Sequence, residues 1–114
     1  SLIGGIKMDK FKTAFIAHAP DADGSRDRCQ IETGMAKFFA ALVHSQAEAL
    51  EVAKKLVEEE GVQSIVLCPG FSNLDVAEIQ KAVEGKAAVC ASRGDGPGSK
   101  ITMAAMEKAG WFHR

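Results

Sequence analysis

The chain lacks the features that mark disulfide-stabilised, membrane-spanning or nucleic-acid-binding proteins. Its three cysteines, Cys29, Cys68 and Cys90, are an odd set without C-x-x-C spacing, which predicts no disulfide framework and a reducing, cytoplasmic location. No apolar run approaches the ~20 residues that cross a bilayer, and no signal-peptide pattern opens the chain, so we expect no membrane partner. Fourteen basic residues against fifteen acidic ones give a net charge of -1. Nucleic-acid binding, which needs a basic excess, is therefore not expected.

Patterns that bind metals are also missing. The segment 21–27 partly imitates a calcium loop, because Glu32 falls twelve positions along from Asp21. Arg26, however, occupies the sixth position, where the sharp turn of such a loop requires glycine. The histidines are scattered singly and supply no close-spaced pair of zinc ligands; they are His18, His44 and His113. We expect an exposed acidic turn at 21–27 and no metal site, and the sequence identifies no cofactor.

The 114 residues have the composition of one soluble globular domain. Hydrophobic residues make up 46% of the chain and charged residues 25%, which excludes a disordered or collagen-like chain. A chain of this length can bury a core of its own. We predict a single α/β domain over residues 12–114, preceded by a flexible N-terminal segment or cloning remnant over residues 1–11.

Short apolar runs alternate with helical patterns from residue 13 onwards. The apolar runs are too short for helices and predict buried strands at 13–17, 64–68 and 87–91. Two S-x-x-[ED] capping boxes, Ser45–Glu48 and Ser72–Asp75, predict helices that end before Gly61 and Gly85. After a glycine-rich loop, Ser99 is the predicted cap of a last helix that runs to Ala109.

Residues 35–43 admit two interpretations. Met35, Phe38, Phe39 and Leu42 have helical spacing, but Gly34 could equally turn the chain into a hairpin strand. We favour a strand over 37–43, because the next helix starts directly after it. The fold predicted is an α/β layer with a four- or five-stranded, mostly parallel sheet and about three helices. The direction of the first strand remains open.

Ligands of open parallel sheets bind outside the carboxyl ends of the strands. Three loops, 18–21, 68–73 and 92–96, leave strands in that direction, and they meet if the first strand is parallel to the others. The second loop leads into a helix N-terminus, whose free N–H groups favour an anion. Arg93 stands among glycines and could clamp a carboxylate or phosphate. The sequence thus predicts a small anionic metabolite held by Gly70, Phe71, Ser72, Asn73 and Arg93.

Each of these residues also has a structural interpretation, and two other functions stay open. Ser72 could simply cap a helix, and Arg93 could form a surface ion pair. An enzyme using the same pocket would employ His18 as acid or base, or Cys68 as nucleophile. A structural protein without a ligand would instead bury the aromatic tail 111–114 against other copies of itself, so a homo-oligomer is expected.

Three segments together resemble a known family. They are Ala19-Pro20-Asp21-Ala22-Asp23, the helix pattern from Glu48 to Gln63, and Cys68-Pro69-Gly70-Phe71. Their order is similar to that of small bacterial and archaeal proteins catalogued as a domain of unknown function, over roughly residues 12 to 92. Those proteins tend to have C-G-G-F where Pro69 stands here, and proline removes one N–H from any anion cradle. The resemblance implies the α/β fold and, since the family has no established activity, no catalytic residue.

Overall fold

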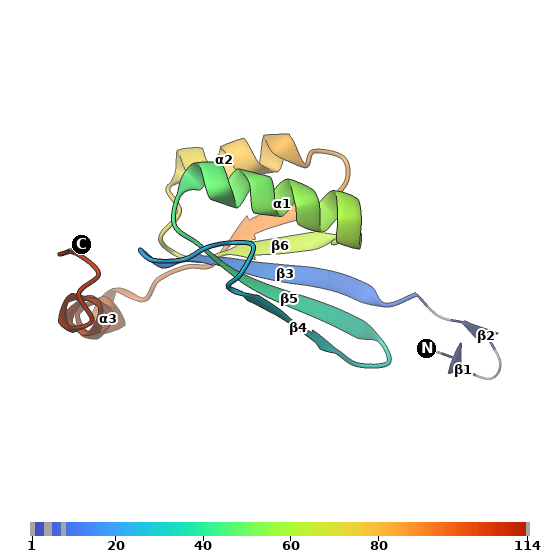
Figure 1. The fold of residues 1–114 in the computed structure, drawn as a ribbon, viewed down its shortest axis with the longest axis horizontal. Helices are drawn as coiled ribbons and strands as arrows, with labels where there is room; N and C mark the ends of the chain where they lie inside the picture. The colour runs from blue at the N-terminus through green and yellow to red at the C-terminus, as the bar shows by residue number, and fades with distance from the viewer. Residues whose placement is uncertain (1, 4–5, 8, 114) are drawn as a thin grey trace.

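The computed structural model describes residues 2–3, 6–7 and 9–113 and contains a five-stranded sheet with two helices packed on one face (Figure 1). The strands lie in the order β4-β5-β3-β6-β7. Strands β3, β5, β6 and β7 are parallel, and the edge strand β4 is antiparallel to β5. Their bounds are β3 Phe11–His18, β4 Arg28–Glu32, β5 Ala36–Val43, β6 Ser64–Leu67 and β7 Ala88–Ala91. The predicted α/β class is confirmed, and the first strand of the sheet runs parallel to its neighbours.

The N-terminal residues stand outside this sheet. Strands β1 (Leu2–Ile3) and β2 (Ile6–Lys7) form a short antiparallel pair of their own. The flexible segment predicted for residues 1–11 lies partly outside the described residues and stays a prediction. Strand β3 begins at Phe11, two residues before the apolar run 13–17 from which it was predicted.

The ambiguous segment 35–43 is a strand, as favoured. A tight turn joins β4 to β5, in which the Thr33 hydroxyl accepts hydrogen bonds from the backbone N–H groups of Met35 (3.2 Å) and Ala36 (3.0 Å). Across the turn the Thr33 N–H donates to the carbonyl of Ala36. Hydrogen bonding to β3 and β4 on both sides then outweighs the helical spacing of the apolar residues in this segment.

Helices α1 (Gln46–Glu60) and α2 (Asn73–Ala82) begin where the two capping boxes predicted. At α2 the box is complete, because Ser72 and Asp75 each accept the other's backbone N–H. At α1 only half of it forms. The Ser45 hydroxyl accepts from the Glu48 N–H, whereas the Glu48 carboxylate reaches past Ser45 to the N–H of His44.

The last helix, α3 (Gly96–Lys108), starts earlier than predicted. Ser99 is not its cap; the N-cap is Asp95, which makes no side-chain capping hydrogen bond. Pro97 explains the difference, because its fixed φ and missing N–H suit the first turn of a helix. The Ser99 hydroxyl instead donates to the carbonyl of Gly96 inside that turn.

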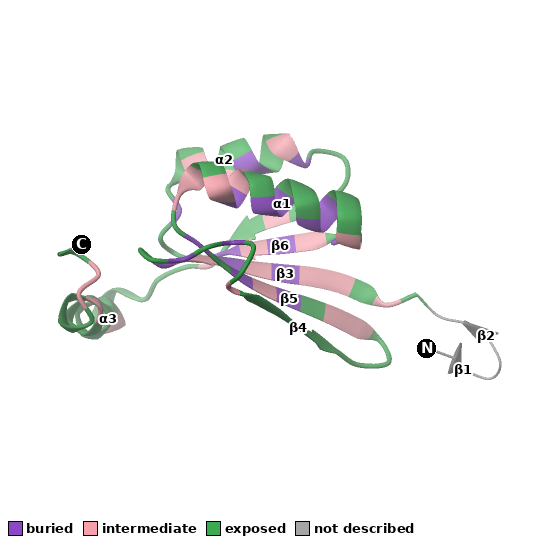
Figure 2. Cartoon of the chain, in the orientation of Figure 1, coloured by how far each residue is buried: buried purple, intermediate pink, exposed green. Residues whose placement is uncertain are grey.

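The core lies between the sheet and helices α1 and α2. Its largest fully buried side chains come from both layers, and they are Ile16, Val43, Leu56, Val62, Ile65, Leu67, Ile79 and Val83. Helix α3, beyond the carboxyl ends of the strands, has no buried residue (Figure 2). The β1–β2 pair also lies away from the sheet, at the opposite end (Figure 1). The radius of gyration of 15.8 Å therefore exceeds the ~13 Å of a compact domain of this length. Within the described residues, no helix is long and apolar enough to cross a membrane.

Candidate functional site

A groove of about 510 Å³ separates the carboxyl edge of the sheet from α3. His18 at the end of β3, Pro69 and Gly70 after β6, and Gly94 after β7 form its floor. All three predicted loops therefore reach one site, since parallel strands end at a common edge. Its opposite wall is largely apolar and comes from α3 and the tail, with Met103, Met106, Trp111 and Phe112.

His18 is the titratable side chain at the floor of the groove. Its ring packs on that of Phe71, with 4.2 Å between the ring centroids and a tilt of 37°. Burial lowers the pKa of His18, and the nearby Asp75 carboxylate offsets part of that effect. A neutral imidazole is therefore favoured at pH 7, and it offers one hydrogen-bond donor and one acceptor.

Gly70 lies between the two residues that the sequence proposed for catalysis. A Cβ atom at Gly70 would stand 3.4 Å from the Cys68 Sγ and 3.4 Å from the His18 Cδ2. Cys68 and His18 thus flank the same backbone segment. No hydrogen bond joins their side chains in the part of the chain that the structure describes, so the nucleophile and the acid or base stay predictions.

The N-terminus of α2 already has a negative group of its own. Ser72 and Asp75 use their side chains to satisfy each other's N–H groups, and the Asp75 carboxylate lies in the first turn. Phe71 is buried beneath His18, and Asn73 is exposed as the first helical residue. An external anion would compete with Asp75 here, and the anion site predicted over Gly70–Asn73 stays untested.

Arg93 is exposed and directly precedes Gly94, but its side chain does not line the groove. It makes no ion pair with Asp95 or with any other described residue. Of the described residues lining the groove, none is lysine or arginine. The polar side chains supplied by the last part of the chain are Asp95, Ser99 and Thr102.

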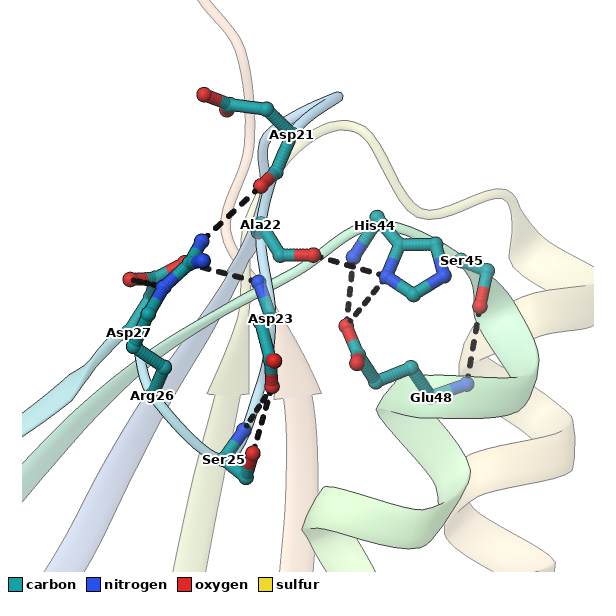
Figure 3. Close-up of polar contacts among 9 residues, drawn as sticks. All are labelled: Asp21, Ala22, Asp23, Ser25, Arg26, Asp27, His44, Ser45 and Glu48. Carbon is teal, nitrogen blue, oxygen red and sulfur yellow. Dashed lines mark hydrogen bonds and ion pairs between the residues drawn. The ribbon is translucent and has the colours of Figure 1, made fainter.

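The acidic turn at 21–27 has a structural role (Figure 3). Asp23 accepts hydrogen bonds from both the N–H and the hydroxyl of Ser25. Asp27 binds Arg26 through both of its carboxylate oxygens, and this pairing lowers the pKa of Asp27 to about 2. The carboxylates thus hold the turn together.

A second polar cluster ties this turn to α1 (Figure 3). The Nδ1 atom of His44 lies 2.9 Å from the carbonyl of Ala22, and Glu48 accepts from the His44 N–H. Desolvation alone would raise the pKa of Glu48, but hydrogen bonds from the N–H groups of His44 and Gly24, together with the His44 side chain, lower it.

Glu32 lies at the far end of β4, where it pairs with Lys10 at 2.7 Å. It is therefore remote from the acidic turn with which the calcium-loop spacing would have joined it. Among the described residues, no three His, Cys, Asp or Glu side chains are placed to hold a metal ion.

Sequence reasoning missed one whole wall of the groove. It assigned the aromatic tail 111–114 to packing between subunits, and it gave Ser99 a capping role. The available signal was topological: a helix that follows the last parallel strand through a short loop must begin at the carboxyl edge.

Comparison with known proteins places the chain in a family without an assigned activity. A sequence model described as "Family of unknown function (DUF6506)" matches residues 11–106. This range includes the whole five-stranded sheet and nearly all of α3. No curated protein and no solved structure matches the chain.

Proposed function

The chain belongs to this family of unknown function, and we propose that it binds a small, largely apolar molecule in the groove between the strand ends and α3. The observation that carries the proposal is the groove itself. In it the imidazole of His18, whose lowered pKa favours the neutral form, faces a wall of methionine and aromatic side chains. Small-molecule sites are commonly concave and mostly apolar, with a few polar groups that fix orientation.

The polar groups of the groove narrow the ligand class further. His18 can donate or accept one hydrogen bond, and Ser99 and Thr102 add hydroxyl groups on the opposite wall. With Asp95 present and no described lysine or arginine in the lining, a strongly anionic ligand lacks a counter-charge. The ligand we favour carries an aromatic or aliphatic body and one uncharged polar group. Arg93, which directly precedes the groove residue Gly94, stays the candidate contact for an anionic group.

Trp111 provides an internal reporter for this site. It is the only tryptophan of the chain and it lines the groove, so a ligand that enters will change its fluorescence. We would titrate the protein with 2-phenylethanol, phenylacetate and inorganic phosphate. Saturable changes with 2-phenylethanol, weaker changes with phenylacetate and none with phosphate are expected. A saturable response to phosphate alone would favour the anion site instead.

Two glycines of the first turn of α3 supply a matched pair of variants. A Cβ atom at Gly98 or at Gly96 meets nothing within 4 Å, but only Gly98 lines the groove. Gly98→Phe should fill the groove and abolish the response to 2-phenylethanol, whereas Gly96→Phe should leave it intact. Equal responses in the two variants would show that the probe binds elsewhere.

An enzyme using the same groove has less support. Its candidate groups, His18 and Cys68, both flank Gly70, but the thiol is half-buried and is not hydrogen-bonded to the imidazole in the described structure.

A further inference from the structure

The face of the sheet opposite α1 and α2 has no helix over it (Figure 1). Most of its residues are apolar. The strand register aligns Cys29, Ala40, Phe15, Val66 and Cys90 in one row across all five strands of this face. The adjoining row contains two large exposed side chains, Ile31 and Phe38, which are 62% and 37% exposed. We call this surface the open face.

The distribution of charge shows that the open face differs from an ordinary solvent-facing surface. Residues alternate between the two faces along every strand. In β3 to β7 the charged side chains all fall on the side of the helices, and these are Lys12, Arg28, Glu32 and Lys37. The open face has none within the described strands. A sheet with one face in water normally shows the opposite pattern, with its polar residues on the uncovered side.

The edge strand β4 shows this unusual distribution of polar and apolar residues most clearly. All five of its residues are exposed in the single chain (Figure 2). Arg28, Gln30 and Glu32 point to the helix side, where Arg28 lines a hollow that α1 also lines. Cys29 and Ile31 point to the open face. Polar and apolar residues alternate along β4 as they do in a strand with one buried face. The apolar residues of β4 lie on the open face.

We propose that a second copy of this chain covers the open face, so that the protein is a symmetric homodimer. An uncharged apolar face is complementary to itself and needs no matching charge, as a two-fold interface requires. Sheets packed face to face lie about 10 Å apart with interleaved side chains. The hollow of about 470 Å³ beside Phe15, Cys29 and Leu42 provides the recess into which a side chain of the second copy would fit. Its lining also includes the charged residues Arg26, Asp27 and Arg28, of which Arg26 and Asp27 form an ion pair with each other.

The area of the open face indicates that α3 takes part. With ~3.3 Å per residue and ~4.8 Å between strands, the face measures about 450 Å² in plan. Two copies would bury about 900 Å² through their sheets alone, slightly less than the ~1,000 Å² that a specific interface needs. Helix α3 has no buried residue in its own chain and exposes Ile101, which does not line the groove, by 76%. Contact with α3 of the second copy supplies the missing area.

Sedimentation equilibrium tests the proposal directly. The wild-type chain is expected at twice its single-chain mass of 12.1 kDa. Leu42→Glu is expected at the single-chain mass, because a carboxylate on the open face would be desolvated within the interface. Ile31→Lys, on the edge strand, is a second disrupting variant that leaves the core untouched. Leu74→Glu is the matched control: Leu74 is an exposed leucine, 83% accessible, on α2, and its replacement should leave the dimer intact.

Two results would overturn the proposal. A wild-type chain of single-chain mass at every concentration would mean that no second copy covers the open face. A dimer that survives both Leu42→Glu and Ile31→Lys would place the interface elsewhere. Both outcomes are independent of ligand binding in the groove, because neither variant lines it.

Discussion

The two faces of the sheet are built from alternate residues of the same strands, yet they serve different purposes. In β6, Ile65 and Leu67 are fully buried under α1 and α2, while Val66 between them faces the open side and is only half-buried. One face supplies the free energy that folds the chain. The other retains apolar surface that the single chain does not bury, which is the usual sign of an interaction site.

The largest difference in stability between substitutions on the two faces is expected for neighbouring residues of β6. Ile65→Ala leaves a cavity in the closed core and should reduce the free energy of unfolding by about 2–5 kcal/mol. Val66→Ala should cost less than half as much, because Val66 is partly exposed. Urea denaturation measures both, in a Leu42→Glu background that removes dimerisation from the comparison. Equal losses would contradict the division between the faces.

The acidic turn packs against α1, on the helix-covered side of the sheet, and substitution of Gly24 tests this packing. A Cβ atom there would stand 2.7 Å from the Cγ2 atom of Val52 on α1. Gly24→Ala should therefore destabilise the fold by about 1–3 kcal/mol through overpacking. Adding Val52→Ala should restore part of the loss, whereas Gly96→Ala, which meets open space, should not destabilise. Failure of the Val52→Ala change to rescue would mean that the contact is not the cause.

Helix caps extend the comparison to α3. Ser72 satisfies a backbone N–H at the start of α2, so Ser72→Ala should lower the free energy of unfolding by about 1 kcal/mol. Asp95 occupies the same position in α3 but makes no capping bond, and α3 buries nothing. Asp95→Ala should therefore lower the free energy of unfolding by less than Ser72→Ala does. Thermal unfolding of the two variants measures both losses. A larger loss for Asp95→Ala would show that α3 is integral to the core.

The smallest expected effect is the contribution of His18 to the pH dependence of the free energy of unfolding. Burial lowers the pKa of His18 below 6.5, so between its folded pKa and 6.5 the unfolded chain binds more protons than the folded one. The free energy of unfolding should therefore rise with pH through this window, and His18→Gln should remove the rise. Proton NMR of the imidazole gives the pKa directly. A pKa above 6.5 would contradict a desolvated ring at the floor of the groove.

Local patterns predicted the sheet well because its strands and caps are encoded within a few residues. The runs 13–17 and 64–68 and the Ser72–Asp75 box needed no information from distant parts of the chain. Helix α3 was predicted with the wrong start because Pro97, a better helix initiator than Ser99 in this loop, was overlooked. The groove wall could not be assigned, since it depends on how α3 lies against the strand ends, which short-range spacing does not determine.

Alkylation of the native cysteines is the measurement that tests the central claim most directly. Cys29 and Cys90 are both exposed in the single chain, and both lie in the row across the open face. If a second copy covers that face, their rate of reaction with iodoacetamide falls as protein concentration rises, and Leu42→Glu restores the fast rate. Rates that are fast at every concentration, and equal in wild type and Leu42→Glu, would contradict the assignment of the open face as an interface.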